Sequence, residues 1–411
     1  MSRIEELIER LCPEGVEYRK LGDCIISLKT GLNPRKFFKL NESDSFYPYI
    51  TGKDIFNNRI NVTEKTDKIS SDVIKLINKR AQLDDGNLLF ASTGTGTVGR
   101  MAIIENYEDN WAISETLYSI KVDETYVNVK YLMYVLYTDI ALSQYVPKIS
   151  KGSVPHLKIK DLLNVSIPVP PLEVQQEIVR ILDNFTNLSE KLNEELELRK
   201  KQYEYYREKL LSFEGEEVEW KKLSEVSTKI SSGGTPSTKV MQYYEGDIPW
   251  LRTQEVDWKY VYDTEIKITQ EAVNNSSAKL IPRDCLIIAM YGATAAKACI
   301  NKIPLTTNQA CCNIQIDSLQ AINKYIFYWI NKEYLTLKNM GEGSQSNLNA
   351  KKIKDFLVPI PPLSEQRRIV SILDAFDTLI NDTKKGLPAE IAALNQQYEY
   401  YRDQLLTFKQ K

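Results

Sequence analysis

The chain has 411 residues, a length that usually corresponds to two or more domains. Its 53 lysine and arginine residues nearly balance 55 acidic residues, which excludes both a histone-like basic protein and an acidic solvating tail. Hydrophobic residues make up 43% of the chain and aromatic residues 10%, enough to fill sizeable cores. The single histidine, His156, excludes a zinc site with two histidine ligands and restricts any histidine-dependent hydrolase to that one residue.

The N-terminal segment predicts a short amphipathic helix, because Ile4, Leu7, Ile8 and Leu11 recur at helical spacing. Its charges distinguish it from a signal peptide. The six cysteines show no C-x-x-C spacing and mostly lie in apolar runs, which indicates buried thiols in a reducing compartment. No apolar run approaches the roughly 20 residues of a membrane span. We therefore expect a soluble, cytoplasmic protein.

The dominant feature of the sequence is an internal repeat. Pro168-Val-Pro-Pro-Leu172 returns as Pro359-Ile-Pro-Pro-Leu363, and the run from Gln202 to Phe213 returns almost unchanged from Gln397 to Phe408. Fainter matches extend upstream, including Asn87-Leu-Leu-Phe-Ala-Ser-Thr-Gly94 with Cys285-Leu-Ile-Ile-Ala-Met-Tyr-Gly292. Self-similarity of this kind indicates a duplicated structural unit. Each half should contain a globular part of about 150 residues, followed by a proline-rich hinge and a long helix.

The long helices are predicted to begin after the two Pro-Pro pairs, because proline suits the start of a helix but not its interior. Their apolar residues alternate in steps of three and four, which is typical of a coiled-coil seam and favours packing of the two helices as an antiparallel pair. Lys385-Gly-Leu-Pro388 should interrupt or kink the second helix. The residues expected to pack these helices or to dock partner subunits are Ile181, Phe185, Leu192, Tyr203, Tyr206, Leu210, Ile372, Phe376, Tyr398, Tyr401 and Leu405.

The globular parts are predicted to be α+β. Strands are expected at 87–91, 100–104 and 117–122, joined by Gly, Thr and Ser turns. Helices are expected at 129–137 and, in the second copy, at 322–330. The predicted boundaries are 1–167 for the first globular part with its N-terminal helix, 168–216 for the first long helix, 217–358 for the second globular part and 359–411 for the second long helix.

One segment could be a nucleotide-binding loop. Gly94-Thr-Gly-Thr-Val-Gly99 fits the G-x-G-x-x-G pattern and follows a predicted strand. The phosphate site would need a helix directly after the loop, but Arg100-Met-Ala-Ile-Ile104 is predicted to be a strand. The repeated counterpart, Gly292 to Lys297, keeps only the first glycine. A tight turn between strands is the better interpretation.

Catalytic and metal sites are not predicted. The carboxylates form no pair at a telling spacing that recurs in both halves, and His156 aligns with Asn347, so a catalytic role would be lost in the second copy. A polar contact from two equivalent loops explains this pair more simply. The chain is therefore interpreted as a binding protein, although loss of catalysis in only one copy remains an alternative.

Charge differs between segments. Residues 19–160 carry 20 basic and 16 acidic residues, and residues 217–358 carry 17 and 15, so both globular parts are mildly basic. The first long helix, 172–216, has 7 basic and 11 acidic residues, and the second is neutral. This distribution is compatible with DNA contacts made by the globular parts.

Candidate DNA-contacting residues lie in loops that combine cations with amide, hydroxyl and aromatic groups, because Arg pairs with guanine and Asn or Gln with adenine in the major groove. The alternative is that these are ordinary solvated loops. In the first half the candidates are Lys53, Arg59, Thr93, Arg100, Lys151, Ser153, His156 and Lys158, and in the second half they are Arg252, Gln254, Tyr291, Lys297, Asn308, Gln309, Ser344, Gln345 and Asn347.

The whole chain resembles the DNA-specificity subunit of bacterial type I restriction–modification systems. The resemblance rests on Pro-x-Pro-Pro-Leu followed by Gln-Gln or Glu-Gln and by Ile-Val-x-Ile-Leu-Asp, on Gln-Tyr-Glu-Tyr-Tyr-Arg in both halves, and on Lys385-Gly-Leu-Pro-Ala-Glu-Ile391. The first helix lacks this last motif, so the two helices need not have equal shapes.

The resemblance implies a non-catalytic subunit in which each globular part reads one half of a bipartite target in double-stranded DNA. It implies two modification subunits that methylate adenine with S-adenosylmethionine and, where the system includes them, two restriction subunits that use ATP, so no cofactor is expected in this chain. The helices would set the gap between the half-sites and dock the modification subunits. A coiled-coil scaffold or adaptor that does not bind DNA remains the alternative.

Overall fold

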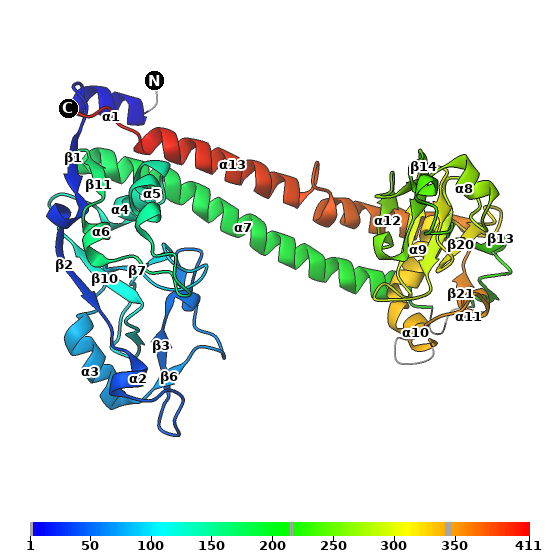
Figure 1. Cartoon of the computed structure of the whole chain (residues 1–411), viewed down its shortest axis with the longest axis horizontal. Helices are drawn as coiled ribbons and strands as arrows, with labels where there is room; N and C mark the ends of the chain where they lie inside the picture. The colour runs from blue at the N-terminus through cyan, green and yellow to red at the C-terminus, as the bar shows by residue number, and fades with distance from the viewer. Residues whose placement is uncertain (1–2, 214, 216, 342–346) are drawn as a thin grey trace. The chain divides into compact units, whose positions relative to one another are not determined.

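The computed structural model describes residues 3–213, 215, 217–341 and 347–411, which form two compact units (Figure 1). The first unit extends through Leu192 and includes Ile391–Lys411, and the second spans Asn193–Glu390. Each unit therefore combines one globular repeat with portions of both long helical segments. The first portion of the long helix α7 (Leu172–Leu210) belongs to the first unit, and its remainder belongs to the second.

The first globular part mixes short helices with short strands, as the sequence predicts. Its helices and 3-10 turns are α1 Arg3–Leu11, η1 Leu21–Cys24, α2 Pro34–Phe37, η2 Gly52–Asp54, α3 Ser71–Ala81, α4 Val129–Leu136, α5 Asp139–Tyr145, η3 Val146–Lys148 and α6 Ile159–Leu163. Its strands are β1 Glu17–Lys20, β2 Ile25–Thr30, β3 Tyr47–Ile50, β4 Ile55–Phe56, β5 Arg59–Ile60, β6 Lys68–Ile69, β7 Leu88–Ala91, β8 Met101–Ile103, β9 Ala112–Ile113, β10 Leu117–Val122 and β11 Ser166–Val169.

A four-stranded antiparallel sheet in the order β2-β10-β7-β8 organises this part. Side chains on successive strand residues point to opposite faces. In β7, Leu88 and Phe90 face the core that contains α4 and α5, whereas Leu89 and Ala91 face the core that contains α3 and β9. Both faces are therefore covered, which explains why β7 is apolar along its whole length.

The second globular part repeats this plan. Its helices and 3-10 turns are η4 Met241–Tyr244, η5 Thr253–Glu255, α8 Gln270–Asn274, α9 Asn323–Lys332, α10 Tyr334–Asn339 and α11 Ala350–Lys354. Its strands are β12 Glu219–Lys222, β13 Ser227–Ser232, β14 Ile248–Leu251, β15 Tyr260–Val261, β16 Lys267–Ile268, β17 Leu286–Ala289, β18 Ala298–Asn301, β19 Thr306–Thr307, β20 Cys311–Ile316 and β21 Leu357–Ile360.

The main sheet of the second part has the order β13-β20-β17-β18-β15, so its first four strands match those of the first part. Two smaller sheets also recur. The pair β1-β11 corresponds to β12-β21, and β6-β3-β9 corresponds to β16-β14-β19. In both parts the first of these small sheets joins the start of the globular part to the strand that precedes a long helix.

The second helical segment is divided into α12 (Leu363–Asn381) and α13 (Leu387–Leu406). The break has a local cause, because the Asp382 carboxylate accepts hydrogen bonds from the backbone nitrogens of Lys384 and Lys385 at 2.7 and 3.1 Å. The predicted interruption is therefore confirmed. The predicted α+β class, with two globular parts each followed by long helical structure, is confirmed as well.

All six cysteines are buried and unpaired, as their apolar surroundings predicted. Burial raises the pKa of the Cys24 and Cys285 thiols to about 11. In the described part of the chain, no helix combines the length and the apolar character needed to cross a membrane.

Candidate nucleic-acid interface

The Gly94 loop is a turn between two antiparallel strands. It connects β7 to β8, and Gly94, Gly96 and Gly99 all adopt positive φ angles that favour glycine. Because a strand follows the turn, the helix start that a dinucleotide phosphate site requires is not there. The interpretation as a tight turn between strands is confirmed.

This turn is joined to a second loop, which follows η3 and carries the only histidine. Gly94 N donates to Pro155 O at 3.0 Å and Leu157 N donates to Ser92 O at 2.8 Å. His156 Nδ1 lies 2.7 Å from the Thr93 hydroxyl, and the two residues form an antiparallel bridge. The predicted candidates Thr93 and His156 are thus brought together.

The rest of the second loop is open to solvent. Lys151, Ser153 and Lys158 are exposed, and none of them makes an ion pair with a described residue. Lys158 immediately precedes the short helix α6. These side chains can reach a polyanion without breaking an internal contact.

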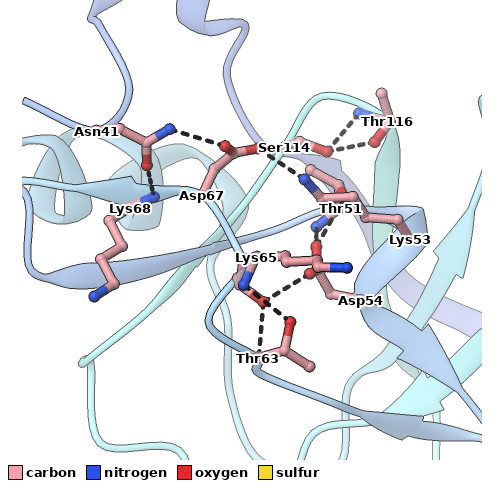
Figure 2. A network of polar contacts seen from close by, with 11 residues as sticks. Asn41, Thr51, Lys53, Asp54, Thr63, Lys65, Asp67, Lys68, Ser114 and Thr116 are labelled. Carbon is pink, nitrogen blue, oxygen red and sulfur yellow. Dashed lines mark hydrogen bonds and ion pairs between the residues drawn. The ribbon is translucent and has the colours of Figure 1, made fainter. Parts of the chain in front are cut away.

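The Lys53 loop is held by a network of carboxylates and hydroxyls, which Figure 2 shows. The buried Asp54 carboxylate accepts from Thr51 N at 2.9 Å and from the Thr51 hydroxyl at 2.8 Å. Lys53 Nζ lies 2.9 Å from an Asp67 oxygen, and Asn41 donates to the other Asp67 oxygen at 3.0 Å. The Asn41 hydrogen bond, together with Lys53, lowers the pKa of Asp67 although burial opposes it. Lys53 is therefore oriented by an acidic partner rather than free.

Two further candidates of the first part make internal contacts. The Arg59 guanidinium pairs with Glu190 of α7 at 2.8 Å, so it links the globular part to the helix of its own unit. Arg100 Nη1 donates to Ile55 O at 3.1 Å. Both arginines therefore support the fold, and a contact with DNA would compete with these interactions.

In the second part, Arg252 occupies the position that corresponds to Thr51 of the first part. It lies one residue before a 3-10 turn. Its guanidinium pairs with Glu265 and, at 3.4 Å, with Glu255. With its amide oxygen turned toward Arg252, Gln254 accepts from that guanidinium at 2.9 and 3.1 Å. Lys297 pairs with Asp257 at 2.7 Å. The cations of this part are thus also prearranged by neighbouring acidic groups.

The remaining candidates of the second part lie in its own loops. Tyr291 and Asn347 are exposed, and Asn308 donates its backbone N–H to Leu251 O at 2.9 Å. Gln309 contacts the Thr235 hydroxyl. Ser344 and Gln345 lie outside the described residues.

The two loop sets are held by matching backbone hydrogen bonds. Leu348 N donates to Met290 O at 2.8 Å, as Leu157 N does to Ser92 O. Met290 N donates to Ala310 O, as Ser92 N does to Thr116 O, both at 2.8 Å. The same framework therefore presents Ser92-Thr93 and His156 in one unit and Met290-Tyr291 and Asn347 in the other.

The sequence motifs after the Pro-Pro pairs have a structural role that their pattern alone did not reveal. Gln175 and Gln366 are fully buried. Gln175 accepts from Asn128 N and donates to Pro170 O, both at 2.8 Å, and Gln366 makes the same pair of bonds with Ile322 N and Pro361 O. Each glutamine therefore fixes the start of a long helix to the helix α4 or α9 of its own unit.

A second repeated contact lies two turns further along each helix. Asp183 accepts from the Tyr134 hydroxyl at 2.7 Å and from Lys130 Nζ at 2.9 Å. Asp374 receives the equivalent contacts from Tyr328 at 2.6 Å and Lys324 at 2.7 Å. We call Gln175, Asp183, Gln366 and Asp374 the anchor residues. Their identity in both copies, within the repeated motifs, was the signal that could have revealed them.

The aromatic residues of the helices pack within each unit. In the first unit the Phe185 ring lies 5.6 Å from Tyr401 and 6.4 Å from Tyr398, and Ser189 bonds to Asn395, so α7 and α13 run antiparallel there. In the second unit the Phe376 ring lies 5.5 Å from Tyr206 and 6.4 Å from Tyr203. Each tyrosine pair thus meets a phenylalanine of the other helical segment rather than the other tyrosine pair.

The remaining predicted packing residues divide between helix contacts and globular cores. Ile181 and Leu405 pack on the core of the first unit and Leu210 on that of the second. Leu192 and Ile372 are half-buried.

Comparison with known proteins decides the family. The model of the type I restriction modification DNA specificity domain matches residues 13–198 and again residues 215–393. The chain belongs to the family of type I restriction–modification specificity subunits. Its two matches in tandem correspond to two recognition domains, one in each unit.

Two relatives and one solved structure illustrate the similarity of this specificity subunit. It is 41% identical over 248 residues to the EcoR124I/EcoR124II specificity subunit of Escherichia coli, an alignment that covers 59% of this chain and 61% of that subunit. It is 32% identical over 322 residues to a chain of Haemophilus influenzae provisionally named as a type I restriction enzyme specificity subunit, covering 75% and 80%. A crystal structure of the S subunit from M. genitalium matches with a TM-score of 0.57 at 15% identity, covering 95% and 96%, and supports the fold.

Proposed function

We propose that this specificity subunit selects the DNA target of a type I restriction–modification complex, with each recognition domain reading one half of a bipartite sequence. The observation that carries the proposal is the combination of equivalent frameworks with different loops. The anchor residues and the loop-closing hydrogen bonds match in the two units, whereas the side chains that the loops present differ. A common framework that carries different loop side chains is what reading two different half-sites requires.

The chain itself supplies binding and orientation in this proposal, and the chemistry belongs to partners. Two modification subunits would bind S-adenosylmethionine and transfer the methyl group to adenine, and restriction subunits, where present, would use ATP. We expect the assembly to act in the cytoplasm. Among the described residues, no group of three or more His, Cys, Asp and Glu side chains could hold a metal ion.

The helices are proposed to dock the modification subunits through exposed tyrosines. Tyr205 is 60% exposed and Tyr400 is 61% exposed, and each lies at the same position of the repeated Gln-Tyr-Glu-Tyr-Tyr-Arg motif. Exposed tyrosines of this kind are common anchors in protein interfaces. One such tyrosine in each copy fits the binding of two identical partners.

The helices are also proposed to set the gap between the half-sites. Four residues inserted into α7 add about 6 Å of helix. We expect the gap in the methylated motif to change by one to two base pairs, because one turn of about 10 base pairs spans about 34–36 Å and 6 Å is therefore the rise of roughly two base pairs. An unchanged gap in an active variant would contradict this role.

The proposal is tested by sequencing methylated adenines in cells that express the subunit with its modification subunit. Alanine at Arg252, Gln254 or Asn347 should relax only the second half-site, by about 1–3 kcal/mol per lost bidentate contact. Alanine at Lys53 or Lys158 should weaken only the first half-site. Glu265→Gln is the matched control for Arg252, because it removes one of the two ion pairs of Arg252 but keeps the guanidinium.

The same variants separate the proposal from a scaffold that does not bind DNA. A scaffold would give no shift of bipartite duplexes in a gel, with or without the modification subunit. Simultaneous relaxation of both half-sites by Arg252→Ala would contradict the assignment of one domain to one half-site.

A further inference from the structure

The only histidine of the chain is held by hydrogen bonds at the loop surface of the first recognition domain. His156 N donates to the Ser150 hydroxyl at 3.0 Å, and Ser150 N donates back to His156 O at 3.0 Å. The residue is half-buried, and its Nδ1 lies 2.7 Å from Thr93 Oγ1. Two hydrogen bonds therefore hold the backbone of His156, and the contact of Nδ1 with Thr93 orients its ring.

A chain of hydroxyls behind Thr93 determines which ring nitrogen carries the proton. The Ser92 hydroxyl donates to Thr116 O at 2.9 Å, and a carbonyl oxygen can only accept. Ser92 Oγ lies 3.2 Å from Thr93 Oγ1. Because the single Ser92 proton is already used, a hydrogen bond between the two hydroxyls requires Thr93 to donate. Thr93 Oγ1 then has no proton left for His156, so it accepts a hydrogen bond from Nδ1–H.

The opposite direction of the chain is less favourable. If Thr93 donated to Nδ1 and Ser92 donated to Thr93, Ser92 Oγ and Thr116 O would face each other at 2.9 Å with no proton between them. Two oxygen atoms at that distance repel each other, and one hydrogen bond would be lost. Of the two neutral tautomers of the ring, the network therefore favours the one with its proton on Nδ1.

Such an imidazole has an unprotonated Nε2, which is a hydrogen-bond acceptor. The structure shows no bond from another described residue to this atom. We propose that Nε2 of His156 accepts a hydrogen bond from the exocyclic amino group of a base in the first half-site. This inference rests on the proposed function. The amino groups that a duplex offers are adenine N6 and cytosine N4 in the major groove and guanine N2 in the minor groove.

The second recognition domain provides an internal control for this arrangement. There Met290, Tyr291 and Ala310 replace Ser92, Thr93 and Thr116 on the same backbone hydrogen bonds. The Ala310 carbonyl is still present, but methionine has no hydroxyl that could donate to it, and Asn347 replaces the histidine. A primary amide both donates and accepts, so this position is not restricted to one partner polarity. The fixed acceptor is a feature of the first domain.

The protonation state is measured by NMR on the full chain labelled with 15N in the histidine ring. Because the chain has one histidine, the spectrum contains one pair of ring nitrogens. We expect the proton on Nδ1 in the wild type and in Thr93→Ser, which keeps the hydroxyl. Thr93→Val should shift the population toward the Nε2–H form. A proton on Nε2 in the neutral wild type would overturn the inference.

Base recognition is measured with duplexes in which one amino group of the first half-site at a time is removed, using purine or pyrimidinone analogues for adenine and cytosine and inosine for guanine. At one position we expect binding by the wild type, co-expressed with its modification subunit, to weaken about five- to tenfold, the size of one hydrogen bond. His156→Ala should be insensitive at that position. Asn347→Ala, which is expected to weaken reading of the second half-site, should keep the wild-type fold-loss at that position of the first half-site.

Failure of the proposed function and failure of the acceptor role of His156 give different results. If the wild type does not bind the bipartite duplex at all, the proposed function is wrong. If it binds but His156→Ala shows the same sensitivity as the wild type at every position, DNA recognition stands and the acceptor role of His156 is wrong.

Discussion

The anchors of the long helices and the loops of the recognition domains have diverged to very different degrees. Gln175 and Gln366 make the same hydrogen bonds in the two units, and so do the tyrosine partners of Asp183 and Asp374. The loops share only their backbone hydrogen bonds. Ser92-Thr93 in the first unit corresponds to Met290-Tyr291 in the second. The difference indicates that the anchors serve a requirement common to both halves, whereas the loops serve requirements that differ.

The largest effect is expected at the buried glutamines. Gln175→Leu or Gln366→Leu removes the bonds of one backbone N–H and two backbone carbonyls to the buried amide, which costs on the order of 3 kcal/mol. Because the contacts match, the two variants should lower stability by similar amounts in urea unfolding. A loss in only one half would break the equivalence of the anchors.

A smaller effect is expected at the anchor aspartates. Tyr134→Phe and Tyr328→Phe each remove one hydrogen bond to a carboxylate, about 1–2 kcal/mol, while Lys130 and Lys324 still pair with the same carboxylates. Matched losses of thermal stability would sharpen the comparison. If Tyr328→Phe were neutral while Tyr134→Phe was not, Asp374 would not be acting as the counterpart of Asp183.

The smallest effect concerns alkaline pH. Burial raises the pKa of Tyr203 and of Tyr398 to about 12. Since an unfolded tyrosine titrates near pH 10, the stability gained from keeping these phenols neutral is full below about pH 10 and is lost as the pH rises toward 12. Tyr203→Phe and Tyr398→Phe should therefore lose less stability than the wild type over this pH range, as measured by urea unfolding.

The exposed neighbours on the same helices provide the control. Tyr205 and Tyr400 lie in the same repeated motif but are largely exposed, so Tyr205→Phe and Tyr400→Phe should leave the alkaline loss unchanged. If the Phe variants at the half-buried positions 203 and 398 behaved like those at the exposed positions 205 and 400, packing of Tyr203 and Tyr398 would not control the titration.

The fold could be predicted from the sequence to the extent that it depends on local patterns. The Pro-Pro pairs predicted where α7 and α12 begin, and the apolar runs predicted β7, β8 and β10. The duplication then extended each assignment to the second half. The pairing of Phe185 with Tyr401 and of Phe376 with Tyr206 was less accessible, because seam spacing does not fix which turns of two helices meet.

The candidate interface was predictable mainly as a set of loops. The sequence identified the loops that carry His156 and Asn347, but it could not show that Lys53, Arg59, Arg252 and Lys297 pair with acidic residues on other segments of the chain. It also could not show that Ser92 and Thr116 continue the contact from His156, since that network depends on the distance between separate strands. Such contacts are set by tertiary packing and leave no local pattern.

The account is tested most directly by exchanging one recognition domain for a copy of the other. Arg19 pairs with Ile167 and Lys221 pairs with Val358 in equivalent two-stranded sheets, so residues 221–358 can be replaced by residues 19–167 at matching junctions. Sequencing of methylated adenines should then give a target in which both half-sites carry the bases of the original first half-site. Retention of the original second half-site by an active chimera would contradict the claim that each domain reads its own half.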